Sequence, residues 1–287
     1  MNFLKDGWFS EVSELWPGRC FSFEVEQVLH HEKSQYQDIK VMKTKSHGNA
    51  LVLDGIIQCT EHDEFAYQEM ISFLPLFAHP NPQKVLIVGG GDGGVAREVS
   101  KHPQVKEIVQ VEIDQKVIDV SKKYLKFMSC GFDSPKLDLK VCDGFEYMRN
   151  HKEEFDVIIT DSSDPIGPAV NLFTENYFKL LHEALKPNGV ICSQAETVWI
   201  DLEYVRNIVQ QCKKHFTNVK YAYASVPTYP TGQIGFVLAS KDGQLDLTTP
   251  RKTIGETELR DMKLRYYNSE MHSAAFVLPN FALVSPI

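Results

Sequence analysis

A glycine-rich segment could hold a nucleoside against the backbone. The sequence VLIVGGGDGGVAREV runs from a strand-like apolar run through Gly89, Gly90 and Gly91 into a helical pattern. Glycine permits a tight turn and a close approach between the backbone and a ligand. The same loop could be a strand-to-helix turn that binds nothing, because a lone glycine motif is weak evidence. Glu112 favours a ligand, since it ends the next expected strand, where nucleoside-binding α/β folds place a carboxylate on the ribose hydroxyls.

An acid inside this loop indicates the charge of the ligand. Asp92 would repel a pyrophosphate but attract a sulfonium or an ammonium group. The loop also lacks the Lys-Ser/Thr ending of a Walker A motif. We therefore expect a ligand of the S-adenosylmethionine type rather than a dinucleotide. Asp143 and Gly144 follow the third expected strand, at the edge where such sheets bind ligands, and an acceptor there could take the exocyclic amine of adenine.

Two acids in the segment DVIITDSSDPIGPAVNLF could bind and deprotonate a cationic amine. Asp161 and Asp164 directly follow a continuously apolar strand, and a carboxylate within hydrogen-bond reach of an amine can act as its base. Taken alone, both acids also suit a turn, because Asp-Pro pairs often begin one. Beside Asp92 and Glu112 this turn interpretation loses weight, since four acids would then meet at one edge of one sheet.

Four further polar residues are weaker candidates. Tyr229 lies between two prolines just before the last expected strand, which is also typical of an exposed turn. Gln37, Gln58 and Gln68 could close over a nucleoside, but their spacing does not distinguish them from surface glutamines. The ten histidines form no HExxH or zinc-type spacing, and the chain has no GxSxG or Cys/His pattern. We therefore expect neither metal catalysis nor a Ser or Cys nucleophile.

Strand–helix alternation after Pro82 predicts the scaffold that brings these residues together. Runs such as VLIV and DVIIT are continuously apolar, which is typical of parallel strands buried on both faces. Alternating strands and helices indicate a doubly wound α/β domain, Rossmann-like, with a seven-stranded sheet. The expected strands are 84–88, 107–111, 136–141, 155–160, 189–193, 220–225 and 235–240, and the expected helices are 93–101, 115–126, 144–151, 174–185, 201–214 and 254–264.

The N-terminal part has a different periodicity. Residues 20–60 alternate in the manner of short antiparallel strands, and Asp54-Gly55 is a favourable hairpin turn. The next residues change to helical spacing, and a proline-rich linker follows. We expect an N-terminal β-sheet domain with its following helix over residues 1–78, and a Rossmann-like catalytic domain over residues 79–287.

Composition limits the partners. The chain has 287 residues, of which 43% are apolar and 24% are charged, and its formal net charge is −8. This negative balance argues against nucleic acid and anionic membrane, which bind basic patches, and it is compatible with a cationic substrate. The sequence shows no secretory leader and no apolar window long enough to span a membrane, and its six cysteines form no CxxC pair. We therefore expect a cytoplasmic protein with reduced thiols.

Short segments spread over nearly the whole chain carry a family resemblance. From Trp8 to Pro279 they are WPG, YQDI, LVLDGIIQCTEHDEFAYQEM, GGGDGG, VEID, DGFEYM, DSSDPIGPA, TYPTGQIGF and YYNSEMHSAAFVLP. In this order they look like the spermidine synthases of eukaryotic type, which are polyamine aminopropyltransferases, and GGGDGG together with DSSDP is highly specific. The resemblance implies a methyltransferase-like Rossmann domain with a small N-terminal antiparallel β-domain, a homodimer, and no metal or prosthetic group.

The resemblance also implies a reaction and roles for the residues. The enzyme would transfer the aminopropyl group of its co-substrate, decarboxylated S-adenosylmethionine, to putrescine, and would release spermidine and 5′-methylthioadenosine. Asp161 would be the general base, and the segment 161–172 would be a gate that orders over bound ligands. The putrescine site would comprise Tyr67, Asp161, Ser162, Asp164 and Tyr229. The donor site would comprise the loop of Gly89, Gly90 and Gly91, then Asp92 with Gln68 at the aminopropyl ammonium, Glu112 at the ribose, Asp143 and Gly144 at the adenine, and Gln37 and Gln58 at the methionine-derived and nucleoside portions.

Three alternatives stay open at this point. A putrescine N-methyltransferase would use intact S-adenosylmethionine, whose α-carboxylate would be repelled by Asp92. Spermine or thermospermine synthesis differs only in the length of the acceptor, and the short N-terminus, without the large extra domain of animal spermine synthases, favours putrescine. A catalytically inactive homologue would be expected to have lost Asp161 or Asp92, and both are present.

Overall fold

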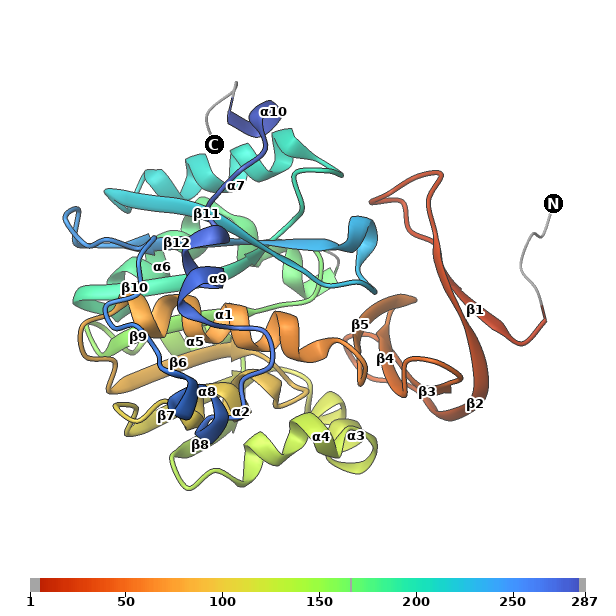
Figure 1. Ribbon diagram of the computed structural model, residues 1–287. Helices are drawn as coiled ribbons and strands as arrows, with labels where there is room; N and C mark the ends of the chain where they lie inside the picture. Colours follow the sequence, from red (N-terminus) through yellow and green to blue (C-terminus); the bar gives the residue numbers. More distant parts are fainter. Residues whose placement is uncertain (1–5, 166, 284–287) are drawn as a thin grey trace.

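A computed structural model describes residues 6–165 and 167–283, which form two β-sheets (Figure 1). The smaller sheet contains β1 (Trp8–Glu11), β2 (Phe21–Lys33), β3 (Asp38–Thr44), β4 (Asn49–Leu53) and β5 (Ile56–Thr60), paired antiparallel in chain order. Asp54 and Gly55 connect β4 to β5 with φ angles of 49° and 84°, as a two-residue hairpin turn with positive φ requires. The expected N-terminal antiparallel sheet is confirmed.

The larger sheet has the strand order β11-β12-β10-β9-β6-β7-β8. Its strands are β6 (Lys84–Gly89), β7 (Glu107–Glu112), β8 (Leu137–Val141), β9 (Phe155–Asp161), β10 (Leu185–Ala195), β11 (Asn218–Ser225) and β12 (Gln233–Ser240). β12 runs antiparallel to β10 and β11, and the pairs β10–β9, β9–β6, β6–β7 and β7–β8 are parallel. The expected seven-stranded, Rossmann-like sheet is therefore confirmed. The strand order reverses between β6 and β9, and doubly wound sheets bind ligands at the carboxyl ends of the strands at such a reversal.

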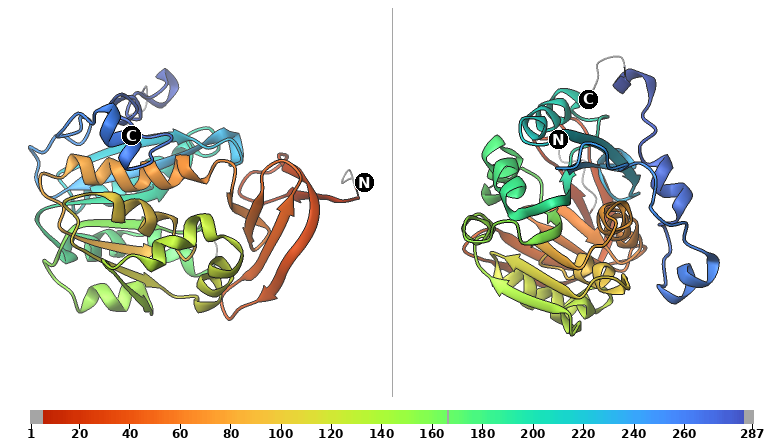
Figure 2. Two further views of the ribbon diagram at one scale, coloured as in Figure 1. Left: turned by 60° about the horizontal axis from the view of Figure 1, so that its bottom comes forward. Right: turned by 90° about the vertical axis from the view of Figure 1, so that its left-hand side faces the viewer.

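Helices cover both faces of the larger sheet (Figure 2). On one face lie α1 (Glu64–Ala78), α2 (Gly94–Lys101) and the C-terminal segment with α8 (Glu256–Asp261) and α9 (Ser269–Ala274). On the other lie α5 (Gly144–Arg149), α6 (Glu175–Ala184), α7 (Leu202–Lys213) and α10 (Asn280–Leu283). The 3₁₀ helices are η1 (Cys130–Asp133), η2 (Gly167–Phe173) and η3 (Pro230–Gly232). Across residues 6–165 and 167–283, no helix combines the length and the apolar character needed to cross a membrane.

The N-terminal sheet packs against the helices that follow β7 through an apolar cluster. The helices α3 (Gln115–Tyr124) and α4 (Lys126–Ser129) follow β7, and their residues Val117 and Met128 share one buried cluster with Leu51 and Leu53 of β4. This packing holds the N-terminal sheet next to the carboxyl ends of the parallel strands (Figure 1).

The helix α1 packs with the larger sheet. Met70, Phe73 and Leu74 are fully buried and belong to the same core cluster as residues of β6, β9 and β10. The sequence pattern had grouped this helix with the N-terminal domain over residues 1–78. Because its apolar surface is buried against the seven-stranded sheet and α2, we propose that the larger domain begins at α1.

Candidate active site

The residues that the sequence predicts for the site line one pocket of about 320 Å³. The pocket lies at the carboxyl ends of β6, β7, β9 and β10, and the ends of β4 and β5 cover it from the N-terminal sheet. The predicted residues found in its lining are Gln37, Gln58, Tyr67, Gln68, Gly89, Gly90, Gly91, Asp92, Glu112, Asp143, Gly144, Asp161, Ser162, Asp164 and Tyr229. Segments far apart in the chain are therefore brought together as expected.

The glycine loop is fixed by its contact with the end of β9. Gly89 pairs with Asp161 in the sheet register, and the Gly90 N–H donates to the Asp161 carbonyl oxygen at 3.0 Å. A Cβ on Gly89 would lie 2.1 Å from that carbonyl oxygen, and both glycines have positive φ angles, 84° and 69°. A side chain at Gly89 would therefore push the loop away from the strand that carries Asp161.

Asp92 is held by two donors at the start of α2. Its Oδ1 accepts from the Gly94 N–H at 2.7 Å, and its Oδ2 accepts from Nε2 of Gln68 at 3.2 Å. Burial raises the pKa of the Asp92 carboxyl, whereas these bonds and the nearby Arg97 charge favour the ionised form. A cation bound beside Asp92 would stabilise the carboxylate further.

Two more acids line the nucleoside end of the pocket, and each uses one oxygen internally. Oε1 of Glu112 accepts from the Asp114 N–H at 2.8 Å, and burial raises the Glu112 pKa to about 7. Oδ1 of Asp143 accepts from the Phe145 N–H at 2.7 Å and caps α5. Each carboxyl group keeps its second oxygen for a ligand.

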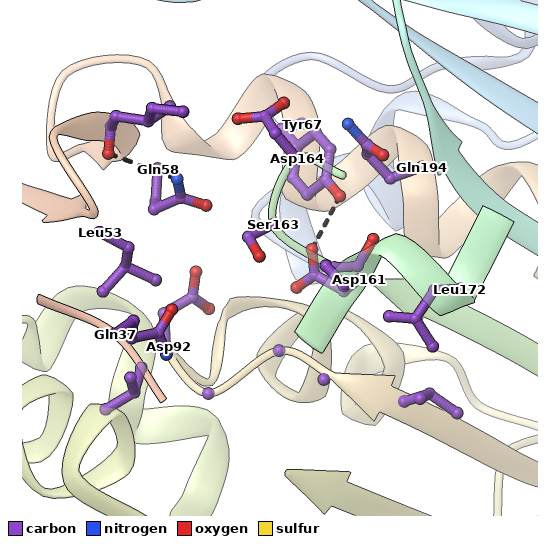
Figure 3. Close-up of a pocket in the computed structure, with 18 of the residues that line it drawn as sticks. Gln37, Leu53, Gln58, Tyr67, Asp92, Asp161, Ser163, Asp164, Leu172 and Gln194 are labelled. Atoms are coloured by element: carbon purple, nitrogen blue, oxygen red, sulfur yellow. Dashed lines mark hydrogen bonds between the residues drawn. The ribbon is translucent and has the colours of Figure 1, made fainter. Parts of the chain in front are cut away.

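Asp161 and Tyr67 form the central pair of the pocket (Figure 3). The Tyr67 hydroxyl donates to Oδ1 of Asp161 at 2.7 Å. Burial, with the nearby Asp92 charge, raises the pKa of Asp161 well above its usual value, and the bond from Tyr67 lowers it. Burial also raises the pKa of Tyr67, so the phenol stays protonated and donates. Oδ2 of Asp161 is left for a proton from a ligand.

The ring of Tyr229 forms part of the pocket wall, and its hydroxyl is hydrogen-bonded to the N-terminal sheet. The hydroxyl donates to the Gln58 carbonyl oxygen at 2.6 Å, and the ring meets the edge of the Tyr67 ring at a centroid distance of 5.9 Å. The Gln58 side chain donates to the Ile56 carbonyl at 3.3 Å. The loop before β12 and the strand β5 are thereby tied together above Asp161.

Glu196 is a site residue that the sequence reasoning missed. It follows β10 directly, lines the pocket and shares a side-chain hydrogen bond with Asp164. Burial, with the Asp164 charge, raises the pKa of Glu196 to about 9, so the two carboxyl groups hold a proton between them near neutral pH. The rule that found Asp161, an acid at the carboxyl end of a buried strand, would also have found Glu196.

Five buried polar atoms on residues that line the pocket have no hydrogen-bond partner within the described parts of the chain. They are Nε1 of Trp16, Oε1 of Gln68, Oγ of Ser162, Oε1 of Gln194 and Oε1 of Glu196. Buried polar groups without a partner are costly, so atoms of this kind at a pocket wall suit contact with a ligand or water. The sequence reasoning assigned no site role to Trp16 or Gln194, although Trp16 lies in the WPG segment that contributes to the family resemblance.

Six acidic residues line the pocket, and the described lining contains no Lys, Arg or His. In the same described residues, no group of three or more His, Cys, Asp or Glu side chains is placed to hold a metal ion. Fold and pocket together are those of an α/β group-transfer enzyme of the methyltransferase type, with an acidic pocket at the edge of the sheet where such folds bind their ligands.

Comparison with known proteins identifies the family. Residues 64–249 match the spermine/spermidine synthase domain, and residues 7–61 match the spermidine synthase tetramerisation domain. The chain is 56% identical to a spermidine synthase of Dictyostelium discoideum, with 98% of both chains covered, and 54% identical to one of Schizosaccharomyces pombe, with 97% and 93% covered. It is 50% identical to a spermine synthase of Saccharomyces cerevisiae, with 98% and 95% covered.

A solved structure agrees with this assignment. The crystal structure of a spermidine synthase in complex with the transition state analogue AdoDATO has a TM-score of 0.88 and 37% identity, with 98% of this chain and 94% of that chain covered. The chain therefore belongs to the spermine/spermidine synthase family and is an aminopropyltransferase. The resemblance to spermidine synthases is confirmed, and the tetramerisation-domain match indicates an oligomer.

Proposed function

We propose that the enzyme transfers the aminopropyl group of decarboxylated S-adenosylmethionine to putrescine and releases spermidine and 5′-methylthioadenosine. The observation that carries this proposal is the charge of the pocket: six acids and no described basic residue line it. Both proposed substrates are cations, and a buried acidic wall selects cations because it lowers the cost of removing them from water.

The donor would occupy the glycine-loop side of the pocket. Glu112 has a free oxygen for the ribose hydroxyls, and Asp143 with Gly144 would face the adenine. Asp92, oriented by Gln68, would bind the ammonium of the aminopropyl group. Residues of the N-terminal sheet and its turns, Gln37 and Gln58, would close over the donor.

Asp161 would be the general base. An amine with a pKa near 10.4 is mostly protonated at pH 7, and keeping it neutral costs about 4.6 kcal/mol. Tyr67 occupies one oxygen of Asp161, so the amine proton would go to Oδ2. The neutral amine nitrogen then attacks the aminopropyl carbon next to the sulfonium, the C–S bond breaks, and its electron pair leaves with neutral 5′-methylthioadenosine.

The second ammonium of putrescine would lie against Asp164 and Glu196. These two carboxyl groups share a hydrogen bond and hold a proton that a bound cation would displace. Ser162 follows Asp161 in the sequence. Its buried hydroxyl oxygen has no hydrogen-bond partner in the described residues and would contact the acceptor. Tyr229 and Tyr67 would enclose the methylene chain between their rings.

A methyltransferase using intact S-adenosylmethionine is the main rival reaction. The α-carboxylate of that donor would approach Asp92, whose two oxygens already accept hydrogen bonds and which has no described Lys or Arg beside it in the pocket wall. The two carboxylates would repel each other, so the acidic loop favours the decarboxylated donor.

The decisive experiment is a product assay by mass spectrometry. The purified protein is offered putrescine or spermidine, each with intact or decarboxylated S-adenosylmethionine. We expect spermidine and 5′-methylthioadenosine from putrescine with the decarboxylated donor alone. N-methylputrescine from the intact donor would replace the reaction, and spermine as the main product would replace the acceptor.

The quaternary structure and location belong to the same proposal. We propose a homodimer in the cytoplasm, with no nucleic-acid or membrane partner. Light scattering after size-exclusion chromatography would measure the mass, for which one chain contributes 32.7 kDa. A tetramer in that measurement would contradict the dimer, and a monomer would also contradict the oligomer that the family match indicates.

A further inference from the structure

Asp114 joins the N-terminal sheet to the larger domain beside the donor side of the pocket. Its side chain is 2% exposed and stands outside the pocket lining. Oδ2 accepts from Oγ of Ser34 at 2.6 Å and from Nε2 of Gln37 at 3.0 Å, and Oδ1 accepts from the Lys116 N–H at 3.1 Å and caps α3. The Asp114 carboxylate is therefore hydrogen-bonded both to the turn between β2 and β3 and to the first turn of α3.

The directions of these hydrogen bonds are fixed by chemistry. A carboxylate can only accept, so the NH₂ end of the Gln37 amide must face Asp114. Ser34 cannot replace Asp114 as the acceptor for the Gln37 amide, because the Ser34 hydroxyl oxygen already accepts from the N–H groups of Tyr36 and Gln37, both at 3.0 Å. The carbonyl end of the Gln37 amide, Oε1, is then the end that is left for a ligand in the pocket.

We propose that Asp114 is a positioning residue that sets the polarity of the Gln37 amide, so that the donor meets an accepting oxygen there. The inference rests on the proposed donor site. The nucleoside hydroxyls and the aminopropyl ammonium of the donor are hydrogen-bond donors, so an acceptor suits them and an NH₂ group would oppose them. Asp114 thus acts on the donor through Gln37 without touching it.

Asp114→Asn tests the proposal with almost no change in shape. Asparagine has a single acceptor oxygen, and when that oxygen keeps the α3 cap its NH₂ group faces the NH₂ group of Gln37. Gln37 would then turn its amide over and present Nε2 to the pocket. A ligand that loses one buried hydrogen bond and meets an unpaired donor binds roughly 10-fold to 100-fold more weakly.

A purely electrostatic role of Asp114 predicts the opposite sign. Burial first, and the Asp114 charge as a smaller contribution, raise the pKa of Glu112. Removing the Asp114 charge would lower that pKa and favour the ionised Glu112 that accepts from ribose hydroxyls. Tighter binding of the nucleoside by the Asp114→Asn protein would therefore support electrostatics and overturn the positioning role.

The experiment is a double-mutant cycle on the full-length protein. Calorimetric affinity for 5′-methylthioadenosine and the KM values of the decarboxylated donor and putrescine are measured for D114N, Q37A and the double variant. Asp119→Asn is the matched control, because it removes the same charge from the exposed face of α3. Where D114N fails to fold, Asp114→Ser retains an oxygen that caps α3 and takes its place.

We expect D114N and Q37A each to weaken 5′-methylthioadenosine binding and to raise the donor KM by about 10-fold or more, with the putrescine KM unchanged. The double variant should be no weaker than Q37A, and D119N should equal the wild type. Three outcomes would overturn this inference but leave the proposed donor site intact. They are additive losses of affinity in the double variant, an unchanged affinity of D114N for 5′-methylthioadenosine, and an equal rise of the donor and putrescine KM values in D114N. A wild-type protein that does not bind 5′-methylthioadenosine would overturn the proposed donor site and this inference with it.

Discussion

Replacing Asp161 with asparagine should separate proton transfer from substrate binding. Asparagine preserves the shape of the side chain and can still accept from the Tyr67 hydroxyl, which lies 2.7 Å from Oδ1. Its NH₂ group then stands where Oδ2 would receive the amine proton. At pH 7 only about one amine in 2,500 is neutral when the pKa is 10.4. If the base supplies this deprotonation, turnover should fall by about 10³-fold, within the usual range for a general base.

The pH profile gives a sharper signature than the rate. Without a protein base the reaction depends on amine that is already neutral, so kcat/KM for putrescine should rise about tenfold per pH unit up to the amine pKa. The wild-type rate should instead level off above the pKa of Asp161. Steady-state kinetics between pH 6 and 10 would measure this, with calorimetry of 5′-methylthioadenosine as the control for the donor site. Turnover within tenfold of the wild type at pH 7 would refute the assignment of the base.

Four other predictions address the remaining features. Asp92→Asn should raise the donor KM about 10-fold to 100-fold but leave 5′-methylthioadenosine binding unchanged, because that product has no aminopropyl ammonium; equal losses for both would contradict the assigned role. Tyr67→Phe removes a bond that lowers the Asp161 pKa, so the acid limb of the rate profile should move to higher pH, and an unshifted limb counts against it. Glu69→Ala leaves three backbone N–H groups of residues 265–267 unpaired and should cost about 3 kcal/mol in urea unfolding, whereas the exposed Glu270→Ala should be neutral. The segment 161–172, of which Ile166 lies outside the described residues, should resist proteinase K only when 5′-methylthioadenosine and putrescine are bound, and equal cleavage would exclude a gate.

The scaffold could be predicted most closely where its strands contain continuously apolar runs, such as VLIV in β6 and VII in β9. The runs that begin at Lys84 and Phe155 end within one residue of the expected positions, since burial on both faces leaves no polar interruption. The prediction for β10 was too short. This strand extends back to Leu185 and changes register before Val190, and its irregular first part contains Pro and Asn, which do not give the continuously apolar pattern that located 189–193.

The pocket was predictable only where its residues follow the ends of strands. Asp161 could be found because a strand end places a side chain at the ligand-binding edge. The hydrogen bond from the Tyr229 hydroxyl to the Gln58 carbonyl oxygen could not be predicted, because only the three-dimensional fold brings these two positions together. The same is true of Asp114 and Gln37, whose contact spans the two sheets.

The acids of the pocket favour the cationic substrates that we propose. Burial is the largest cause that raises the pKa of Asp161, Asp164 and Glu196, and nearby acid charges add to it at Asp161 and Glu196, so the ligand-free pocket holds protons that an ordinary carboxylate would release. A bound diamine supplies the opposite charge that these groups lack and drives them towards the ionised state. In the proposed mechanism Asp161 would therefore become a competent base when its own substrate arrives, and a neutral or anionic ligand in the same place would leave it protonated. Selectivity for cations and activation of the base are in this way one electrostatic property of the pocket.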